Sequence, residues 1–225
     1  QTITADYNDK TALRAFAKSV DVISYEFENI PVETLKKKKK LKPVYPDDYL
    51  LEIAQHRWHE KDFLNGIGIP TAKWARACNA SQVHETLKEW KTDSCILKTV
   101  RFGYDGKGQV KITKSTDISA AFASLKSDEV IIEQIIPFDC EISVIVARDQ
   151  FGTTACYDVV LNEHKDHILS KTTAPAPLPS PLLNKAKKLG VKLADAVGLV
   201  GVLALELFVT KDGKILANEI APRTH

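Results

Sequence analysis

The spacing of apolar residues along the chain alternates between helical and strand-like patterns. Residues 11–19 have the spacing of a short amphipathic helix, and the apolar run at 20–27 predicts a strand directly after it. Residues 52–65 predict a longer helix that ends at Gly66 and Gly68. The helix at 11–19 and the strand directly after it are typical of the end of a βαβ unit.

The rest of the chain predicts both helices and strands, and strands dominate after residue 130. Four prolines within residues 174–181 predict a connector. The predicted helices are 81–90, 115–125 and 182–197, and the predicted strands are 96–99, 109–112, 130–133, 141–147, 153–160, 200–209 and 215–221. This mixture predicts the α/β fold class, arranged as one large domain or two small ones.

Composition and charge exclude several classes of function. The chain is 44% hydrophobic and 27% charged, which is ordinary for a globular protein. Its 31 Lys and Arg residues nearly balance 29 Asp and Glu residues, so no overall electric field favours nucleic acid or a membrane surface. No apolar run approaches the roughly 18 residues that a membrane span needs. We therefore expect a cytoplasmic protein with no nucleic-acid or membrane partner.

The start of the chain and its methionine content are unusual. The sequence begins at Gln1 and has no methionine in 225 residues, although ordinary composition predicts several. We therefore expect this chain to be the middle of a longer protein, and some internal positions to be absent as well.

Five consecutive lysines occupy positions 36–40, and Lys42 follows shortly after them. A solvated helix end or loop is the favoured interpretation, and a phosphate or nucleic-acid patch is the alternative. No aromatic residue lies within the run, which argues against a surface that stacks single-stranded bases.

Two acidic residues stand out in the last two predicted strands, because almost all their neighbours are apolar. Glu206 lies in one strand and Glu219 in the other, and Asp212-Gly213 between them is a strong hairpin signal. If Asp212 and Gly213 form a two-residue loop, Glu206 and Glu219 are equally far from it and face each other across the hairpin.

Opposed like charges destabilise a hairpin unless something compensates them. A divalent cation would do so, and carboxylate oxygens suit Mg²⁺ or Mn²⁺. The alternative is a solvated face, or pairing with a lysine from elsewhere. The two interpretations are about equally supported by the hairpin alone, and a one-residue slip would separate the acids.

A glycine-rich segment, residues 103–109 (GYDGKGQ), lies between two predicted strands, and we call it the glycine flap. A P-loop and a Rossmann fingerprint both open a helix, so neither fits here. A flap between strands can cover nucleotide phosphates, and Lys98 just before it suits the same role. Taken alone, the segment is more simply explained as an ordinary glycine hairpin.

The flap and the acid pair, taken together with their order in the chain, resemble the ATP-grasp superfamily. Four stretches resemble one family within it, the N5-carboxyaminoimidazole ribonucleotide synthetases: residues 24–29 (SYEFEN), 103–109, 162–164 (NEH) and 218–225 (NEIAPRTH). The resemblance implies two ATP-grasp subdomains that clamp the nucleotide, preceded by the remnant of a Rossmann-like domain. The implied divisions are 1–66, 67–131 and 132–225.

The resemblance also implies a reaction, which is the ATP-dependent ligation of bicarbonate to an amine in purine biosynthesis. Bicarbonate attacks the γ-phosphoryl group of ATP to give carboxyphosphate, and the carboxyl group passes to 5-aminoimidazole ribonucleotide. The implied cofactors are ATP and Mg²⁺ or Mn²⁺, and the family commonly forms homodimers. Glu206 and Glu219 match the metal ligands.

By the same resemblance, several residues are expected at the nucleotide. Arg57 and Lys98 match phosphate contacts, residues 133–136 the adenine segment, and Glu141 the ribose ligand. The full expected set is Arg57, Lys98, Gly103, Tyr104, Asp105, Gly106, Lys107, Gly108, Gln109, Glu133, Gln134, Ile135, Ile136, Glu141, His164, Asn218 and Glu219.

The resemblance places other residues at the second substrate and at the bicarbonate. Arg223 and His225 match the pair at the bicarbonate and carboxyphosphate pocket, and with Lys98 they are the expected catalytic residues. Those expected at the aminoimidazole ribonucleotide are Tyr104, Asp105, Lys107, Glu28 and Arg223. Phe102, Thr224 and His167 depart from the family pattern, and Thr224 replaces a usual proline between Arg223 and His225.

Three other functions remain open at the level of sequence. A formate-dependent glycinamide ribonucleotide transformylase shares the clamp but uses formate. A non-catalytic module would bind Mg-ATP without turnover. A nucleic-acid binder would use the lysines at 36–42 and would show steeply salt-dependent affinity.

Overall fold

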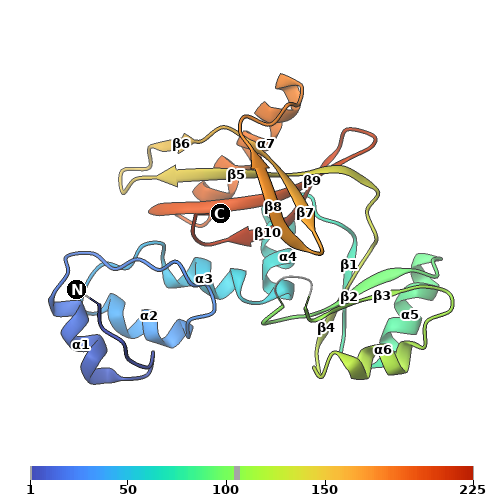
Figure 1. Cartoon of the computed structure of the whole chain (residues 1–225), viewed down its shortest axis with the longest axis horizontal. Coiled ribbons are helices and arrows are strands. Elements are labelled where there is room, and N and C mark those ends of the chain that lie inside the picture. The colour runs from blue at the N-terminus through green and yellow to red at the C-terminus, as the bar shows by residue number, and fades with distance from the viewer. Residues whose placement is uncertain (1, 104–106, 225) are drawn as a thin grey trace.

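The computed structural model describes residues 2–103 and 107–224, and within them it contains two antiparallel sheets joined by a short helix (Figure 1). The N-terminal part carries three helices, α1 (Lys10–Lys18), α2 (Val32–Lys39) and α3 (Asp48–Ala54). A small apolar core between them includes Ala17, Leu35 and Leu51.

The strand predicted at 20–27 is wrong. Only Ile23 pairs, in an isolated parallel bridge to Val44, where its N–H donates to the Pro43 carbonyl. Val22 and Phe27 are exposed, because nothing in the described chain covers them or offers them a neighbouring strand. An extended segment without ladder partners does not form a strand.

The helix predicted at 52–65 is in fact two helices, α3 and α4 (Arg57–Gly66). The break lies at Gln55, whose side-chain Nε2 donates to the main-chain oxygens of Glu28 and Ile30, each at 2.7 Å. The N–H of Arg57 then donates to the Val100 carbonyl at 3.0 Å instead of continuing α3. The break places Arg57 at the start of a helix.

The smaller sheet has the strand order β1 (Trp74–Ala77), β4 (Val130–Glu133), β2 (Cys95–Thr99) and β3 (Gln109–Ile112). Its core is covered by α5 (Ala80–Trp90) and α6 (Ile118–Ser124). Strand β1 was not predicted. Helix α6 begins later than predicted, because the side chain of Asp117 caps it by accepting from the Ala120 N–H.

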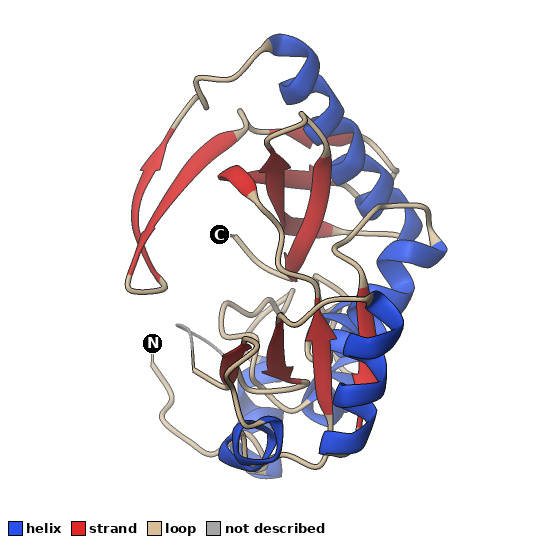
Figure 2. Cartoon of the chain, turned by 90° about the vertical axis from the view of Figure 1, so that its right-hand side faces the viewer, coloured by secondary structure: helices blue, strands red, loops and turns tan. Residues whose placement is uncertain are grey.

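The larger sheet has the order β10 (Ile215–Ala221), β9 (Gly201–Thr210), β5 (Phe138–Arg148), β7 (Val160–Lys165) and β8 (Ile168–Thr173), and β6 (Thr154–Cys156) also pairs with β5. Helix α7 (Ser180–Ala196) lies along one side of this sheet (Figure 2). The approach is close at Gly190, where a Cβ atom would lie 2.8 Å from a methyl group of Val146.

The strand predicted at 153–160 is interrupted, and β8 was missed. Strands β6 and β7 pair with the same edge of β5, but the register shifts between the pairs Val146–Cys156 and Ser143–Val160. The intervening Tyr157 is exposed. Strand β8 is almost wholly exposed, and its two apolar residues, Ile168 and Leu169, are adjacent, so it carries no apolar alternation to predict it.

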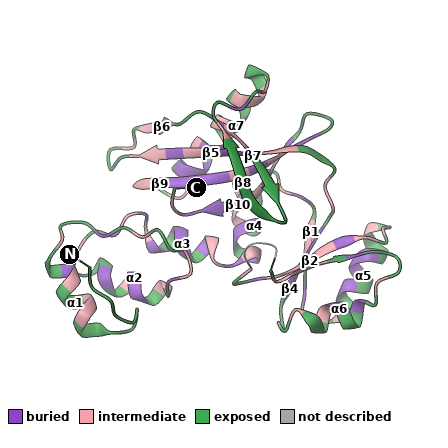
Figure 3. Ribbon diagram, in the orientation of Figure 1, coloured by how far each residue is buried: buried purple, intermediate pink, exposed green. Residues whose placement is uncertain are grey.

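Helix α4 connects the two sheets through opposite ends of its apolar face. Leu64 is fully buried in the core of the larger sheet, whereas Trp58 packs with Val100 and Ile131 of the smaller-sheet region. In the larger sheet, much of β9 and β10 is buried, whereas β8 is exposed (Figure 3). The indole Nε1 of Trp58 also donates to the Val130 carbonyl at 3.1 Å. The first turn of α4 therefore lies where the two sheets approach each other.

No helix in the described part of the chain is both long and apolar enough to cross a membrane.

Candidate functional site

The hairpin of β9 and β10 places Glu206 opposite Glu219, as predicted, but its loop differs from the prediction. Thr210 pairs with Lys214, so the loop spans residues 211–213 and the register beside it is shifted by one residue. A β-bulge at Asn218 shifts the register back. The predicted two-residue loop is therefore wrong. The bulge restores the predicted register from Glu219 onward, and for this reason Glu219 still lies opposite Glu206.

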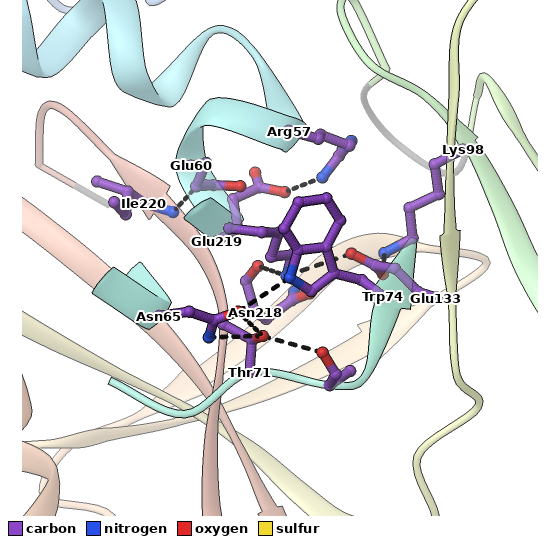
Figure 4. Close-up of polar contacts among 12 residues, drawn as sticks. Arg57, Glu60, Asn65, Thr71, Trp74, Lys98, Glu133, Asn218, Glu219 and Ile220 are labelled. Carbon is purple, nitrogen blue, oxygen red and sulfur yellow. Dashed lines mark hydrogen bonds and ion pairs between the residues drawn. The ribbon is translucent and has the colours of Figure 1, made fainter. Parts of the chain in front are cut away.

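The residues beside Glu219 form a cluster of alternating charges where the two sheets meet (Figure 4). The Arg57 Nη1 atom lies 3.2 Å from Glu219 Oε2. On the smaller sheet, the Nζ atom of Lys98 lies 2.5 Å from one oxygen of Glu133, and Lys61 Nζ lies 3.2 Å from the other. Two predicted cations, Arg57 and Lys98, are thus brought together with two predicted acids.

Two further charged residues of α4 hold the bulge, and the sequence analysis missed both. Lys61 Nζ donates to the Asn218 carbonyl at 2.7 Å, and Glu60 Oε1 accepts from the Ile220 N–H at 2.6 Å. Both side chains are essentially fully buried. A signal was present, because positions 57, 60 and 61 share one helix face with the core residue Leu64.

Burial and neighbouring charges shift the pKa of Glu219, Glu133 and Lys98. Burial alone would raise the pKa of Glu219, but Arg57 and then Lys98 lower it below its usual range. Burial likewise opposes ionisation of Glu133, yet Lys61 and Lys98 lower its pKa strongly. Burial lowers the pKa of Lys98, although Glu133 opposes that change. Glu219 and Glu133 are therefore both ionised. Each could bind another cation in place of the Arg or Lys side chain that it now contacts.

A small cavity of about 40 Å³ opens beside the cluster. Its lining includes Glu28, Arg57, Glu60, Gly103 and Glu219. Polar groups from the N-terminal part, α4, the start of the glycine flap and β10 therefore converge on one space.

The base of the glycine flap is closely packed. Gly108 has a φ of +70°, and a Cβ atom there would lie 2.6 Å from Thr99 Oγ1. The Thr99 N–H donates to the Gly108 carbonyl at 2.7 Å, which closes the base of the flap. Gly103, Lys107 and Gln109 lie at this base, whereas the predicted site residues Tyr104, Asp105 and Gly106 lie outside the described residues.

Two other predicted nucleotide residues form a pair on the larger sheet. Glu141 of β5 and His164 of β7 are joined by a contact of 3.2 Å between Oε2 and Nδ1. Burial raises the pKa of Glu141, His164 opposes this, and Glu206 adds to it. The predicted adenine segment, Gln134, Ile135 and Ile136, runs from β4 of the smaller sheet to β5 of the larger one.

The predicted bicarbonate residue Arg223 contacts the predicted substrate residue Glu28. Its Nε atom donates to Glu28 Oε2 at 3.1 Å, and its Nη1 to the Thr224 carbonyl at 2.7 Å. Burial raises the pKa of Glu28, Arg223 opposes this rise, and the charges of Glu219 and Glu206 add to it. His225, its predicted partner, lies outside the described residues.

These features define a two-sheet α/β protein with a cluster of buried charges at the junction of its sheets. Comparison with known protein families identifies an ATP-grasp domain over residues 62–225 and a ribonucleotide synthetase preATP-grasp domain over residues 1–55. The chain belongs to the ATP-grasp family.

Individual proteins are similar over nearly the whole chain. An N5-carboxyaminoimidazole ribonucleotide synthase of Brucella melitensis is 43% identical over 99% of this chain and 62% of its own length. A Bacillus subtilis protein of the same name is 38% identical over 99% and 58%. The crystal structure of an ADP complex of an N5-carboxyaminoimidazole ribonucleotide synthetase matches with a TM-score of 0.93 at 38% identity, over 99% of this chain and 59% of that one. The chain thus spans about three fifths of the length of these relatives.

Proposed function

We propose that this chain is the nucleotide-binding part of an N5-carboxyaminoimidazole ribonucleotide synthetase. The enzyme would use ATP and bicarbonate to carboxylate 5-aminoimidazole ribonucleotide, giving ADP and phosphate. The observation that carries the proposal is the meeting of Arg57, Lys98 and Glu219 in one cluster, with Glu206 opposed to Glu219. The relatives that are 38–43% identical carry the name of this activity.

In this proposal, Arg57 and Lys98 bind the phosphates of ATP, and the glycine flap covers them. Both cations are paired with acids, so the phosphates would compete with Glu219 and Glu133 for cations that are already held in place. Residues 133–136 would contact adenine, Glu141 and His164 the ribose side of the nucleotide, and Asn218 its phosphate side. The ADP complex of a similar protein supports a nucleotide site in this fold.

Glu206 and Glu219 fit a Mg²⁺ ion by the chemistry of their oxygens. The lowered pKa of Glu219 keeps that carboxylate ionised, as a ligand must be. Among residues 2–103 and 107–224, no group of three His, Cys, Asp or Glu side chains could hold a metal ion. Two protein carboxylates match the usual way of binding Mg²⁺, in which phosphates and water supply the other ligands. When bound, the ion would neutralise charge on the phosphates.

The carboxylation chemistry needs an anion site beside the γ-phosphate. Arg223 has a planar guanidinium that suits bicarbonate, and Glu28 holds it in place at 3.1 Å. Lys98 would stabilise charge on the transferred phosphoryl group, and His225 would complete the bicarbonate pocket. Tyr104, Asp105 and Lys107 of the flap, with Glu28, would contact the aminoimidazole ribonucleotide.

Several coarser features belong to the same proposal. We expect the enzyme to act in the cytoplasm as a homodimer. The expected division at 131/132 is supported by separate apolar cores for the two sheets, although β4 continues across it to Glu133. The division at 66/67 has no such support, because Leu64 and Ile69 on its two sides pack in one core.

The test is phosphate release from ATP by the full-length protein. We expect release only when bicarbonate and 5-aminoimidazole ribonucleotide are both present. Formate with glycinamide ribonucleotide should give none, and release with that pair instead would identify the transformylase activity. ATP binding without release under either condition would contradict the proposal and support a non-catalytic module.

A further inference from the structure

A second cavity lies in the N-terminal part of the chain, where residues of α1 and α2 and of the segments beside them line it. Its volume is about 270 Å³, several times that of the cavity beside Arg57. The two cavities share no lining residue. The proposed function leaves this second cavity without a role.

The second cavity is strongly basic. Among the described residues, no acidic side chain lines it. The acids nearest to it in sequence are engaged elsewhere, since Asp9 caps α1, Asp6 accepts from the Asn8 N–H and Glu33 pairs with Lys36. The cationic residues that line it are Lys10, Arg14, Lys37, Lys38 and Lys40.

Lys38 is the informative member of this set, because it is only 6% exposed. Its ammonium group borders the cavity, and within the part of the chain that the structure describes it has no hydrogen-bond or ion-pair partner. Burial lowers the pKa of Lys38, and the charges of Arg14 and Lys37 lower it further. An ammonium that faces a cavity without a counter-ion, close to other cations, favours the binding of an anion there.

The other faces of the lysine run are already neutralised. Lys36 pairs with Glu52 at 3.2 Å, and Lys39 pairs with Asp48 at 3.0 Å and with Asp47. The face that carries Thr34, Lys38 and Leu41 instead lines the cavity. The run is therefore not a uniform solvated surface, and its unpaired charge gathers at this one place.

We propose that this cavity binds the phosphate group of a phosphorylated small molecule. The five cations would surround the phosphate, and Lys38, whose side chain is held by its packing, would be its central partner. The cavity volume of about 270 Å³ is several times the roughly 30 Å³ that a water molecule takes up in the liquid. The cavity therefore has room for more than a bare phosphate. Tyr7, Leu13 and Leu41 give it apolar walls that suit a small organic group beside the phosphate.

A nucleic acid fits these observations less well. Tyr7 is the single aromatic side chain among the lining residues that the structure describes, so no row of stacking surfaces accompanies the cations.

The experiment is calorimetric titration of the full-length protein with inorganic phosphate, at constant ionic strength and with saturating ADP. The variant Lys38→Met keeps an unbranched side chain but removes the charge. Lys36→Met is the matched control, because it removes one charge from the same run at a residue that does not line the cavity. We expect Lys38→Met to weaken phosphate binding at least tenfold and Lys36→Met to change it less than twofold.

Arg14→Gln, on α1, keeps the test valid if Lys38→Met fails to fold, and it should also weaken binding severalfold. Phosphate affinity that is the same in the wild type, Lys38→Met and Arg14→Gln would overturn the proposal. So would an absence of phosphate binding in the wild type. Steeply salt-dependent binding of a short single-stranded RNA that phosphate does not displace would also overturn it, in favour of nucleic acid.

Discussion

The Nζ atom of Lys61 lies 2.7 Å from the main-chain oxygen of Asn218, at the bulge that sets the position of Glu219. One helical turn supplies the other contacts, since Glu60 holds the Ile220 N–H and Arg57 holds the Glu219 carboxylate. Helix α4 thus fixes the main chain on both sides of Glu219 as well as its side chain. The position of this acid therefore depends on Lys61 and Glu60, which have no direct part in the proposed chemistry, as well as on Arg57.

Loss of the Lys61 charge should destabilise the fold. In Lys61→Met, the Asn218 carbonyl and one oxygen of Glu133 lose their partner inside the core. Breaking a buried pair on one side typically costs about 3–5 kcal/mol, and we expect the free energy of unfolding in urea to fall by about that amount. Lys171→Met is the control, because Lys171 pairs with Glu163 at 2.9 Å on an exposed hairpin. Equal effects of the two variants would contradict this role for Lys61.

Glu60 should make stability depend on pH. Burial raises its pKa from 4.5 to about 8, so the folded protein keeps a proton that the unfolded chain loses. This contribution to stability is complete below about pH 4.5 and is lost as the pH rises through about 8.

The variant Glu60→Gln isolates this effect, since its neutral side chain can still accept from the Ile220 N–H. Relative to Glu60→Gln, the wild type should lose up to about 1.4 kcal/mol of unfolding free energy per pH unit between roughly pH 5 and 8. Urea titrations at several pH values measure the difference. A difference that does not change with pH would show that Glu60 is ionised in the folded state.

The sequence predicted the pairing of Glu206 with Glu219 because both lie in strongly apolar strands around an Asp-Gly turn. It could not predict the bulge at Asn218, which is held by Glu60 and Lys61 from a helix more than 150 residues earlier in the chain. Apolar periodicity likewise predicted most strands but not the break at Gln55. That break depends on hydrogen bonds to Glu28 and Ile30, and spacing along the chain carries no information about them.

The base of the glycine flap should not tolerate a Cβ atom at Gly108. Gly108→Ala adds both the strain of a positive φ and a contact of 2.6 Å with Thr99 Oγ1. Gly198→Ala is the control, because Gly198 has a φ of +59° and nothing within 4 Å of its Cβ position. We expect both variants to lose about 1 kcal/mol from strain, and Gly108→Ala to lose more and to bind ATP more weakly. Identical melting temperatures and ATP affinities would show that the contact at Thr99 is relieved without cost.

The acid pair should control the requirement for Mg²⁺. Glu206→Gln and Glu219→Gln should each raise the Mg²⁺ concentration that gives half-maximal phosphate release by about 10-fold or more. Glu163→Gln on the exposed hairpin should leave it unchanged. For Glu206→Gln, we expect unfolding free energy within about 0.5 kcal/mol of the wild type, because the substitution keeps shape and removes a like charge. A large loss of stability with unchanged Mg²⁺ dependence would mean that Glu206 is purely structural.

The transfer of oxygen from bicarbonate to phosphate tests the central claim most directly. Attack of a bicarbonate oxygen on the γ-phosphorus of ATP forms a new P–O bond and releases ADP. When the carboxyl group leaves the carboxyphosphate, that oxygen stays on phosphorus. With ¹⁸O-labelled bicarbonate, ATP and 5-aminoimidazole ribonucleotide, the full-length protein should release phosphate that carries one ¹⁸O atom, in step with formation of the carboxylated ribonucleotide. Phosphate without ¹⁸O, or released equally well without bicarbonate, would contradict the account.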